Sequence, residues 1–210
     1  MQARWYFDFV SPFAYLQWPK ILALRERLDI TPIPIVFGAV LAHHGQLGPA
    51  EIPGKREFTY GFVQWLAGRE GIVLRFPPAH PFNSLAALRL CVAAGSHGPA
   101  IGAIFDHVWR DGRSGVQATE LDEVARAIGI DDVTVRIAQD DVKAQLRANT
   151  TAAIEGGIFG VPTLAIGQRL FWGNDASPMI DDFLRHPGMF DSHEQQRIAH
   201  LPLGVQRVRR

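Results

Sequence analysis

The sequence predicts an α/β protein whose small sheet-forming core is interrupted by an all-α helical insertion. Three observations support this fold class. The clearest strand patterns occur near the two ends of the chain, at residues 4–10, 33–37, 161–166 and 169–172. Most of the intervening chain has the apolar periodicity of helices. The length of 210 residues and the hydrophobic content of 47% are sufficient for a sizeable core.

The N-terminal elements are predicted to be strand, helix and strand. Residues 4–10 are aromatic and β-branched, as in a buried strand. Ser11 is a good helix N-cap and Pro12 fits the first position of the amphipathic helix that follows. The second strand, at 33–37, contains and follows prolines, which predicts an edge position in the sheet.

The middle of the chain is predicted to be helical. Residues 43–54 are rich in glycine and proline and are expected to form a loop. Helices are expected at residues 56–71, 84–94, 101–109, 121–128 and 142–155. A short segment at 72–76 is the only strand-like interruption.

The β pattern returns late in the chain. Residues 161–166 and 169–172 flank a Gly-Gln turn and predict a hairpin, after which Asn174 and Asp175 are expected to cap a helix. The order β-α-β, helices, β-β-α is that of a thioredoxin-like core split by an insertion. We expect a core from 1–38 and 156–186, a helical insertion domain at 39–155, and a polar C-terminal tail at 187–210.

The composition excludes several classes of function. A single cysteine rules out an internal disulfide, a CxxC redox pair and a multi-cysteine metal site. With 21 basic and 21 acidic side chains, the charge gives no support for nucleic-acid or membrane-surface partners. No apolar run is long enough to span a bilayer, and the N-terminus does not resemble a signal peptide, so we expect a cytoplasmic protein.

Several conspicuous residues are expected to have structural roles only. Cys91 lies in an apolar helical stretch and is predicted to be a buried packing residue, and Trp109 is predicted to be part of the core. His43 and His44 lack a carboxylate or cysteine at ligand spacing, so no metal site is expected. His80 is expected on the surface.

The first motif that bears on chemistry is Ser11-Pro12-Phe13-Ala14, where the first strand joins the first helix. A helix N-terminus offers free N–H groups and a favourable dipole to an anion. A cysteine there would be a reactive thiolate, whereas a serine can only donate a hydrogen bond to a thiolate held by another molecule. An ordinary N-cap without further function explains the same residues.

Two later motifs complete a possible site. In a thioredoxin-like core, Pro162 would be a cis proline, and the unpaired backbone of Val161 could bind an extended peptide. A strand edge feature would also explain the proline. The segment Trp172-Gly173-Asn174-Asp175 links a hairpin to a helix N-terminus, where it could bind charged groups or simply cap the helix.

Together, these motifs resemble those of the 2-hydroxychromene-2-carboxylate isomerase family, which is related to the kappa-class glutathione transferases and the DsbA-like thioredoxin superfamily. The resemblance runs over residues 4 to about 185 and implies glutathione as cofactor. It implies that Ser11 holds and activates the glutathione sulfur. It further implies that the backbone of Val161 before cis Pro162 pairs with the cysteinyl part, and that Trp172, Gly173, Asn174 and Asp175 bind the γ-glutamyl end.

The resemblance also implies an activity, namely interconversion of 2-hydroxychromene-2-carboxylate and trans-o-hydroxybenzylidenepyruvate in the breakdown of naphthalene-type aromatics. The partners would be this small aromatic carboxylate and, because relatives form homodimers, a second copy of the chain. Gln46 occupies a position where relatives often have asparagine near the glutathione thiol. By layout, Lys55, Phe82 and Asn83 fall near the substrate pocket, and Phe13 is a further candidate; a role as exposed loop residues also explains Lys55, Phe82 and Asn83 and is the expected one.

The chain departs from the family pattern where the substrate carboxylate is expected. Leu41 replaces a lysine, and Glu51 and Ile52 replace an Asn-Arg pair. Two other functions are therefore kept open: a kappa-like glutathione transferase that conjugates electrophiles, and a redox-inactive thioredoxin-like module that binds peptides by strand addition.

Overall fold

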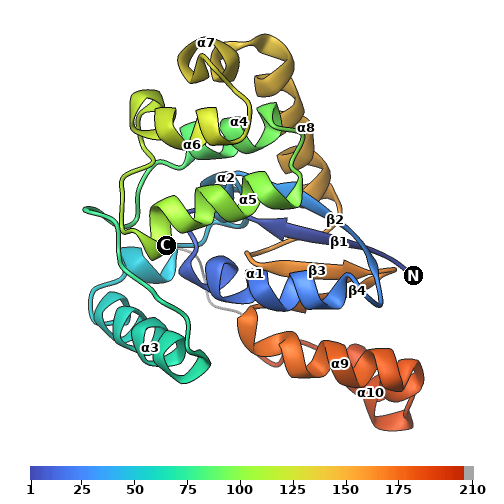
Figure 1. The fold of residues 1–210 in the computed structure, drawn as a ribbon. Coiled ribbons are helices and arrows are strands. Elements are labelled where there is room, and N and C mark those ends of the chain that lie inside the picture. Colours follow the sequence, from blue (N-terminus) through green and yellow to red (C-terminus); the bar gives the residue numbers. More distant parts are fainter. Residues whose placement is uncertain (206–210) are drawn as a thin grey trace.

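The computed structural model describes residues 1–205 and confirms the predicted α/β fold class with its helical insertion (Figure 1). One mixed sheet has the strand order β2-β1-β3-β4. β1 pairs in parallel with β2 and antiparallel with β3, and β3 forms the predicted antiparallel hairpin with β4. The strands are β1 (Gln2–Phe7), β2 (Asp29–Pro34), β3 (Thr163–Ile166) and β4 (Arg169–Trp172).

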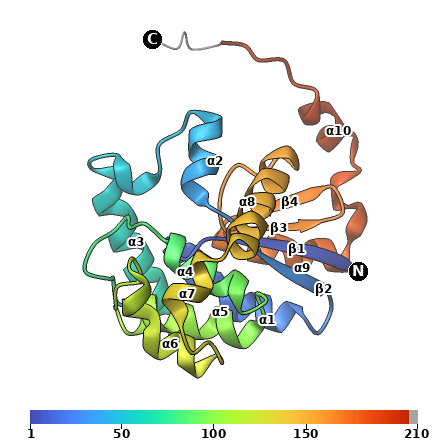
Figure 2. The same cartoon turned by 90° about the horizontal axis from the view of Figure 1, so that it is seen from above.

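Ten α-helices are found among the described residues. They are α1 (Pro12–Leu24), α2 (Phe37–His44), α3 (Lys55–Glu70), α4 (Leu85–Ala93), α5 (Gly98–Phe105), α6 (Asp122–Ala127), α7 (Val133–Ala138), α8 (Asp140–Glu155), α9 (Ser177–Arg185) and α10 (His193–Ala199). Helices α4–α7 lie together at one end of the molecule, whereas α9 and α10 lie at the opposite end (Figure 1). Seen from above, α10 lies at the periphery (Figure 2). None of the helices in residues 1–205 is long and apolar enough to cross a bilayer.

The edge position of the second strand is confirmed, but its predicted range is wrong. β2 covers residues 29–34 rather than 33–37. Beyond it, the backbone donors have other acceptors: Val36 N–H donates to Thr150 Oγ1 at 3.1 Å, and Phe37 N–H donates to Asp8 Oδ2 at 2.9 Å. The segment therefore turns into α2 and does not extend the ladder.

The ends of two other strands also differ from prediction. β1 ends at Phe7, because Asp8 begins a turn in which its carbonyl accepts a hydrogen bond from Ser11 N–H at 3.1 Å. β3 begins at Thr163, after a cis peptide bond between Val161 and Pro162. The predicted cis proline is thus confirmed.

The helical character of the middle segment is confirmed, but five helices were expected and the structure has seven α-helices there, from α2 to α8. Residues 72–76 are not a strand, because Arg75 N–H donates to the Trp109 carbonyl at 2.6 Å in the helical region instead of to the sheet. The expected loop at 43–54 begins too early, since His43 and His44 form the last turn of α2. Helix α7 was missed, and the helix expected at 101–109 is α5 followed by a π-helical turn. The tail at 187–210 contains α10, and its last five residues lie outside the described range.

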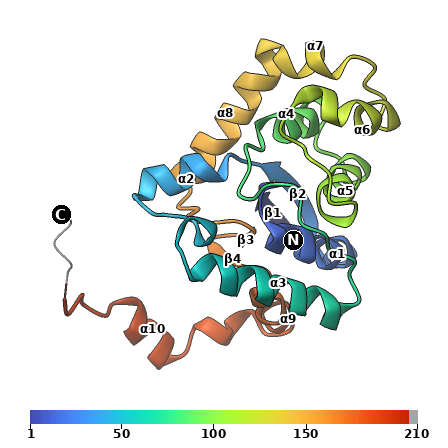
Figure 3. The ribbon, with the colours of Figure 1, turned by 90° about the vertical axis from the view of Figure 1, so that its left-hand side faces the viewer.

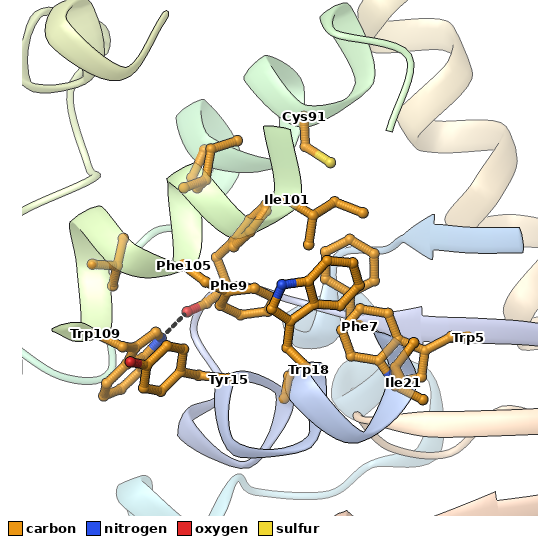
Figure 4. Close-up of a cluster of buried hydrophobic side chains, with 14 of the residues drawn as sticks. Trp5, Phe7, Phe9, Tyr15, Trp18, Ile21, Cys91, Ile101, Phe105 and Trp109 are labelled. Atoms are coloured by element: carbon orange, nitrogen blue, oxygen red, sulfur yellow. Dashed lines mark hydrogen bonds between the residues drawn. The ribbon is translucent and has the colours of Figure 1, made fainter. Parts of the chain in front are cut away.

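The largest core cluster lies between the sheet, α1 and α5 (Figure 4). Trp5 and Phe7 project from the same face of β1 and stack with ring centroids 4.4 Å apart. Trp109 is fully buried, and its Nε1–H donates to the Phe9 carbonyl at 2.8 Å. Cys91 is also fully buried, and burial raises the pKa of its thiol to about 12. The predictions that Trp109 and Cys91 are core residues are therefore confirmed.

Candidate active site

Ser11 caps the N-terminus of α1 as predicted. Its Oγ accepts a hydrogen bond from Ala14 N–H at 3.3 Å, and Pro12 occupies the first turn. The side chain is buried. Because Oγ serves as an acceptor for the helix, its own O–H is left to donate. The helix dipole adds partial positive charge at the same point, so the site favours an anion that accepts a hydrogen bond.

A buried carboxyl shapes the turn that carries Ser11. Asp8 Oδ1 accepts from Val10 N–H at 3.0 Å, and Oδ2 accepts from Phe37 N–H. Burial raises the pKa of Asp8, while hydrogen bonds from Ser84, Val10 and Phe37 act in the opposite direction. From the sequence, Asp8 is only a charged residue at the end of a predicted strand, because Phe37 and Ser84, which bond to it, are far away in the chain. Asp8 therefore holds the β1–α1 turn to the start of α2.

His80 supports the same turn, so its prediction as a surface residue is wrong. The ring is half-buried, and Nε2 lies 2.8 Å from the Val10 carbonyl, immediately before Ser11. The Tyr60 hydroxyl lies 2.8 Å from Nδ1. Because the Val10 carbonyl can only accept, Nε2 carries a proton, and the Tyr60 hydroxyl also donates to the His80 carbonyl at 2.7 Å. Burial lowers the pKa of His80, which favours the neutral form of the ring.

The aromatic surroundings explain why His80 is drawn inward. Its ring packs edge-on against those of Phe76 and Trp109, at centroid distances of 5.8 and 5.5 Å. The peptide bond between His80 and Pro81 is also cis. A histidine followed by proline between aromatic residues was the available signal in the sequence, but it did not identify the contact with Val10.

The second motif presents an unpaired backbone segment. Within residues 1–205, no hydrogen bond is formed by the N–H or carbonyl of Val161. The neighbouring groups are used: Thr163 Oγ1–H donates to the Gly160 carbonyl at 2.7 Å, and Gly173 N–H donates to the Pro162 carbonyl at 2.9 Å. The backbone of Val161 is therefore free to pair with an extended ligand.

The third motif is tied directly to α1. Gln17 Nε2–H donates to the Gly173 carbonyl at 2.9 Å, and Lys20 Nζ–H donates to Asn174 Oδ1 at 2.8 Å. Lys20 also forms an ion pair with Glu70 of α3 at 2.7 Å. The helix that begins with Ser11 thus holds the segment after β4 in place. Gly173 is bonded both to Gln17 of α1 and to the Pro162 carbonyl, so hydrogen bonds link the elements that carry the three sequence motifs.

The predicted helix-capping role of Asn174 and Asp175 is wrong. A 3₁₀ turn covers Asn174–Ala176, α9 starts only at Ser177, and neither element has a side-chain cap. Asn174 is buried with its amide oxygen on Lys20, which removes it from the helix backbone. Asp175 is exposed at the surface.

Trp172 forms an exposed wall beside the cis proline. Its side chain is 54% exposed and meets Phe159 edge-to-face at 5.3 Å. Gly160 lies beneath the indole, since a Cβ at this position would be only 2.5 Å from Trp172 Nε1. The glycine therefore lets the aromatic ring lie close to the backbone that precedes Val161.

The predicted substrate residues are distributed unevenly. Phe13 is half-buried with its ring 6.3 Å from that of Phe62 on α3, and the Phe82 ring lies 6.4 Å from that of His80. Both aromatic residues thus flank the Ser11 turn. Asn83 is exposed and its Oδ1 accepts from Leu85 N–H at 3.1 Å, at the start of α4.

The remaining predicted residues lie on exposed parts of the chain. Gln46 follows α2 and Lys55 begins α3, and no side-chain hydrogen bond of either is found within residues 1–205. Glu51, one of the departures from the family pattern, accepts a hydrogen bond from Gly48 N–H at 2.5 Å. Leu41 and Ile52 are half-buried. Leu41, Glu51 and Ile52 supply no cation for a substrate carboxylate.

Comparison with known proteins places this site in a family. The sequence pattern of the DSBA-like thioredoxin domain matches residues 4–185. The chain belongs to this DsbA-like thioredoxin family. It is 26% identical to a 2-hydroxychromene-2-carboxylate isomerase of Sphingobium xenophagum over 189 residues, which cover 85% of this chain and 95% of the relative.

Two further relatives agree with this assignment. The glutathione S-transferase kappa 2 of Caenorhabditis elegans is 26% identical over 206 residues, covering 88% of this chain and 92% of the relative. A solved structure of a 2-hydroxychromene-2-carboxylate isomerase superposes with a TM-score of 0.81 at 26% identity. The superposition covers 91% of this chain and 98% of that one. The DsbA-like family resemblance inferred from the motifs is therefore confirmed.

Proposed function

We propose that the protein is a glutathione-dependent isomerase that interconverts 2-hydroxychromene-2-carboxylate and trans-o-hydroxybenzylidenepyruvate. The observation that carries this proposal is Ser11, a hydroxyl donor at the N-terminus of α1, in a fold that also has a cis Pro162 preceded by the free backbone groups of Val161. A site of this kind binds a thiolate without itself undergoing disulfide exchange. Similarity to isomerases of the same name supports the choice of reaction.

The residues of the site fit glutathione as a cofactor. The Val161 backbone has a free donor and a free acceptor for the cysteinyl part, and Trp172 provides a wall beside it. The exposed carboxylate of Asp175 suits the α-ammonium group of the γ-glutamyl end, while Gly173 and the Lys20-bound Asn174 shape this end of the site. Gln46, on the loop after α2, is assigned a weaker role near the thiol.

The proposed mechanism depends on stabilisation of negative charge on sulfur. When bound, glutathione would supply a thiolate for addition to the conjugated enone of the ring-opened substrate; the double bond would become a single bond that can rotate, and departure of the thiolate would restore the double bond. Ser11 donates a hydrogen bond to the sulfur, and the α1 dipole favours the thiolate form. His80, by holding the Val10 carbonyl, keeps the Ser11 turn in position. It is a positioning residue in this scheme, because it acts through the backbone.

The substrate is assigned to the side of the site formed by Phe13 and Phe82. Their rings offer an apolar surface for an aromatic compound, and Lys55 and Asn83 are the polar residues assigned to its carboxylate. Leu41, Glu51 and Ile52 carry no positive charge and therefore cannot form an ion pair with this carboxylate.

The decisive experiment follows the loss of 2-hydroxychromene-2-carboxylate by absorbance, with and without glutathione. We expect turnover only with glutathione and no net consumption of the thiol. Glutathione-independent turnover, or none at all with a folded enzyme, contradicts the proposal. S-methylglutathione, which lacks a free thiol, serves as the matched control and should not support the reaction.

A kappa-like glutathione transferase is the second proposed function, because the nematode kappa-class protein is equally similar. This function predicts a stable thioether detected by mass spectrometry after incubation with an electrophile. A redox-inactive peptide-binding module predicts instead that calorimetry detects an extended peptide but no glutathione. A homodimer stays a prediction, and the molar mass measured by light scattering coupled to size-exclusion chromatography checks it.

A further inference from the structure

A pocket that is separate from the proposed glutathione and substrate site lies between α2, α4 and α8. It has a volume of about 340 Å³. Figure 3 shows α8 next to α2 and α4, on one side of the sheet. None of the residues assigned above to glutathione or substrate lines this cavity. Its polar lining consists of Arg89, Lys143, Arg147, Thr150 and Thr151, and the rest of the lining is aliphatic.

The charge of this pocket is unbalanced. Three cationic side chains line it, and the lining includes no aspartate or glutamate. Arg147 has no ion pair within residues 1–205, and Lys143 has only a contact of 3.5 Å with the fully exposed Asp140. By contrast, the surface arginines Arg110, Arg113 and Arg136 are each paired with a carboxylate. The pocket therefore has free positive charge.

Arg89 contributes an unsatisfied hydrogen-bond donor beside the pocket. Its Nε atom is buried and has no hydrogen-bond partner, and it is the only such side-chain atom among the described residues. A buried donor without an acceptor is rare in folded proteins, because it loses its hydration without compensation. Because this atom has almost no accessible surface, an oxyanion in the pocket would reach it only after a shift of the Arg89 side chain. Guanidinium groups bind carboxylates through parallel hydrogen bonds, which suits Arg89 and Arg147.

The shape and walls of the pocket restrict the ligand further. Val36, Leu85 and Ile154 add apolar surface to the lining of the pocket. A volume of about 340 Å³ is at the lower end of the range for small-molecule sites, which extends from about 300 to 1,000 Å³. We propose that this cavity binds a small organic carboxylate with an apolar body, such as a one-ring aromatic acid.

The pocket adjoins the Ser11 turn without being part of it. Thr150 Oγ1, in the pocket wall, accepts from Val36 N–H at 3.1 Å, and the next N–H, that of Phe37, donates to Asp8. Leu85 likewise follows Ser84, whose hydroxyl acts on the Asp8 carboxyl. A carboxylate bound here would therefore lie near Asp8 but would be held by the cations of the pocket.

The test uses calorimetry of the full chain with benzoate as probe. Benzamide has the same ring without the charge, and inorganic phosphate has the charge without the ring. We expect benzoate to bind, and benzamide and phosphate to bind at least about tenfold more weakly. Arg147→Gln and Lys143→Gln should each weaken benzoate binding about tenfold, in line with the loss of one charge-assisted hydrogen bond. Arg126→Gln on α6, outside the pocket, is the matched control.

Three outcomes overturn the proposal. Equal affinity for benzoate and benzamide would show that the cations do not select the ligand. Equal affinity for benzoate and phosphate would show that the apolar walls contribute nothing. Loss of benzoate binding in Ser11→Ala, with binding retained in Arg147→Gln, would place the probe in the Ser11 site. Because Arg147 is exposed, its variant should fold normally, and circular dichroism checks this.

Discussion

Replacement of Ser11 by alanine separates two roles of one hydroxyl. In the folded protein, Oγ accepts from Ala14 N–H, so Ser11→Ala removes an N-cap. Loss of such a cap costs about 1 kcal/mol of stability, within a range of about 0.5–2 kcal/mol. The proposed hydrogen bond to the thiolate is charge-assisted and would contribute about 1.5–3 kcal/mol. If this bond is made mainly in the reactive state, kcat/KM falls about 10- to 150-fold.

The assay measures glutathione-dependent isomerisation by absorbance, and urea unfolding measures stability in the same preparations. Asp132→Ala is the control, because Asp132 caps α7 by accepting from Val135 N–H at 2.9 Å and lies outside the proposed site. This variant should lose similar stability and keep its activity. A Ser11→Ala enzyme with undiminished kcat/KM would refute the catalytic role, and equal losses of activity in both variants would assign the effect to stability alone.

Three further predictions concern the surroundings of the site. Trp109→Phe should lower the free energy of unfolding by about 1–3 kcal/mol, because it leaves the buried Phe9 carbonyl unpaired; an unchanged urea midpoint would contradict this. Gly160→Ala should displace the exposed indole of Trp172 and weaken glutathione binding in calorimetry with little change in Tm; undiminished affinity would remove Trp172 from the site. Since burial lowers the pKa of His80 from 6.5, the unfolded chain takes up its proton first as the pH falls. The stability advantage of the natural chain over His80→Gln should therefore decrease below pH 6.5, and an advantage that grows there would refute the neutral ring.

The parts of the fold that depend on local pattern could be predicted from the sequence. Ser11 and Pro12 are residue types that favour a helix N-terminus by themselves. The hairpin of β3 and β4 is likewise indicated by two strand-forming runs on either side of a short turn. The range of β2 could not be predicted, because it depends on which distant groups accept the hydrogen bonds of Val36 and Phe37.

The same limit applies to the candidate site. The three motifs were recognisable because each is contiguous, and their order in a thioredoxin-like core implied that they meet. Asp8 and His80 were not recognised as supports of the Ser11 turn, since the contacts that define them join residues about 30 and 70 positions apart. Only tertiary packing distinguishes such a histidine from an exposed one.

The burial of Cys91 has a practical and a biological consequence. It is the only cysteine of the chain, it is fully buried, and burial raises the pKa of its thiol to about 12. The folded protein therefore exposes no thiol to alkylating reagents, peroxide or oxidised low-molecular-weight thiols, and these compounds cannot inactivate it through a mixed disulfide. For the experimenter, any cysteine introduced at the surface becomes a unique position for a fluorophore or a spin label. The natural sequence already has the background that such labelling normally requires mutagenesis to obtain.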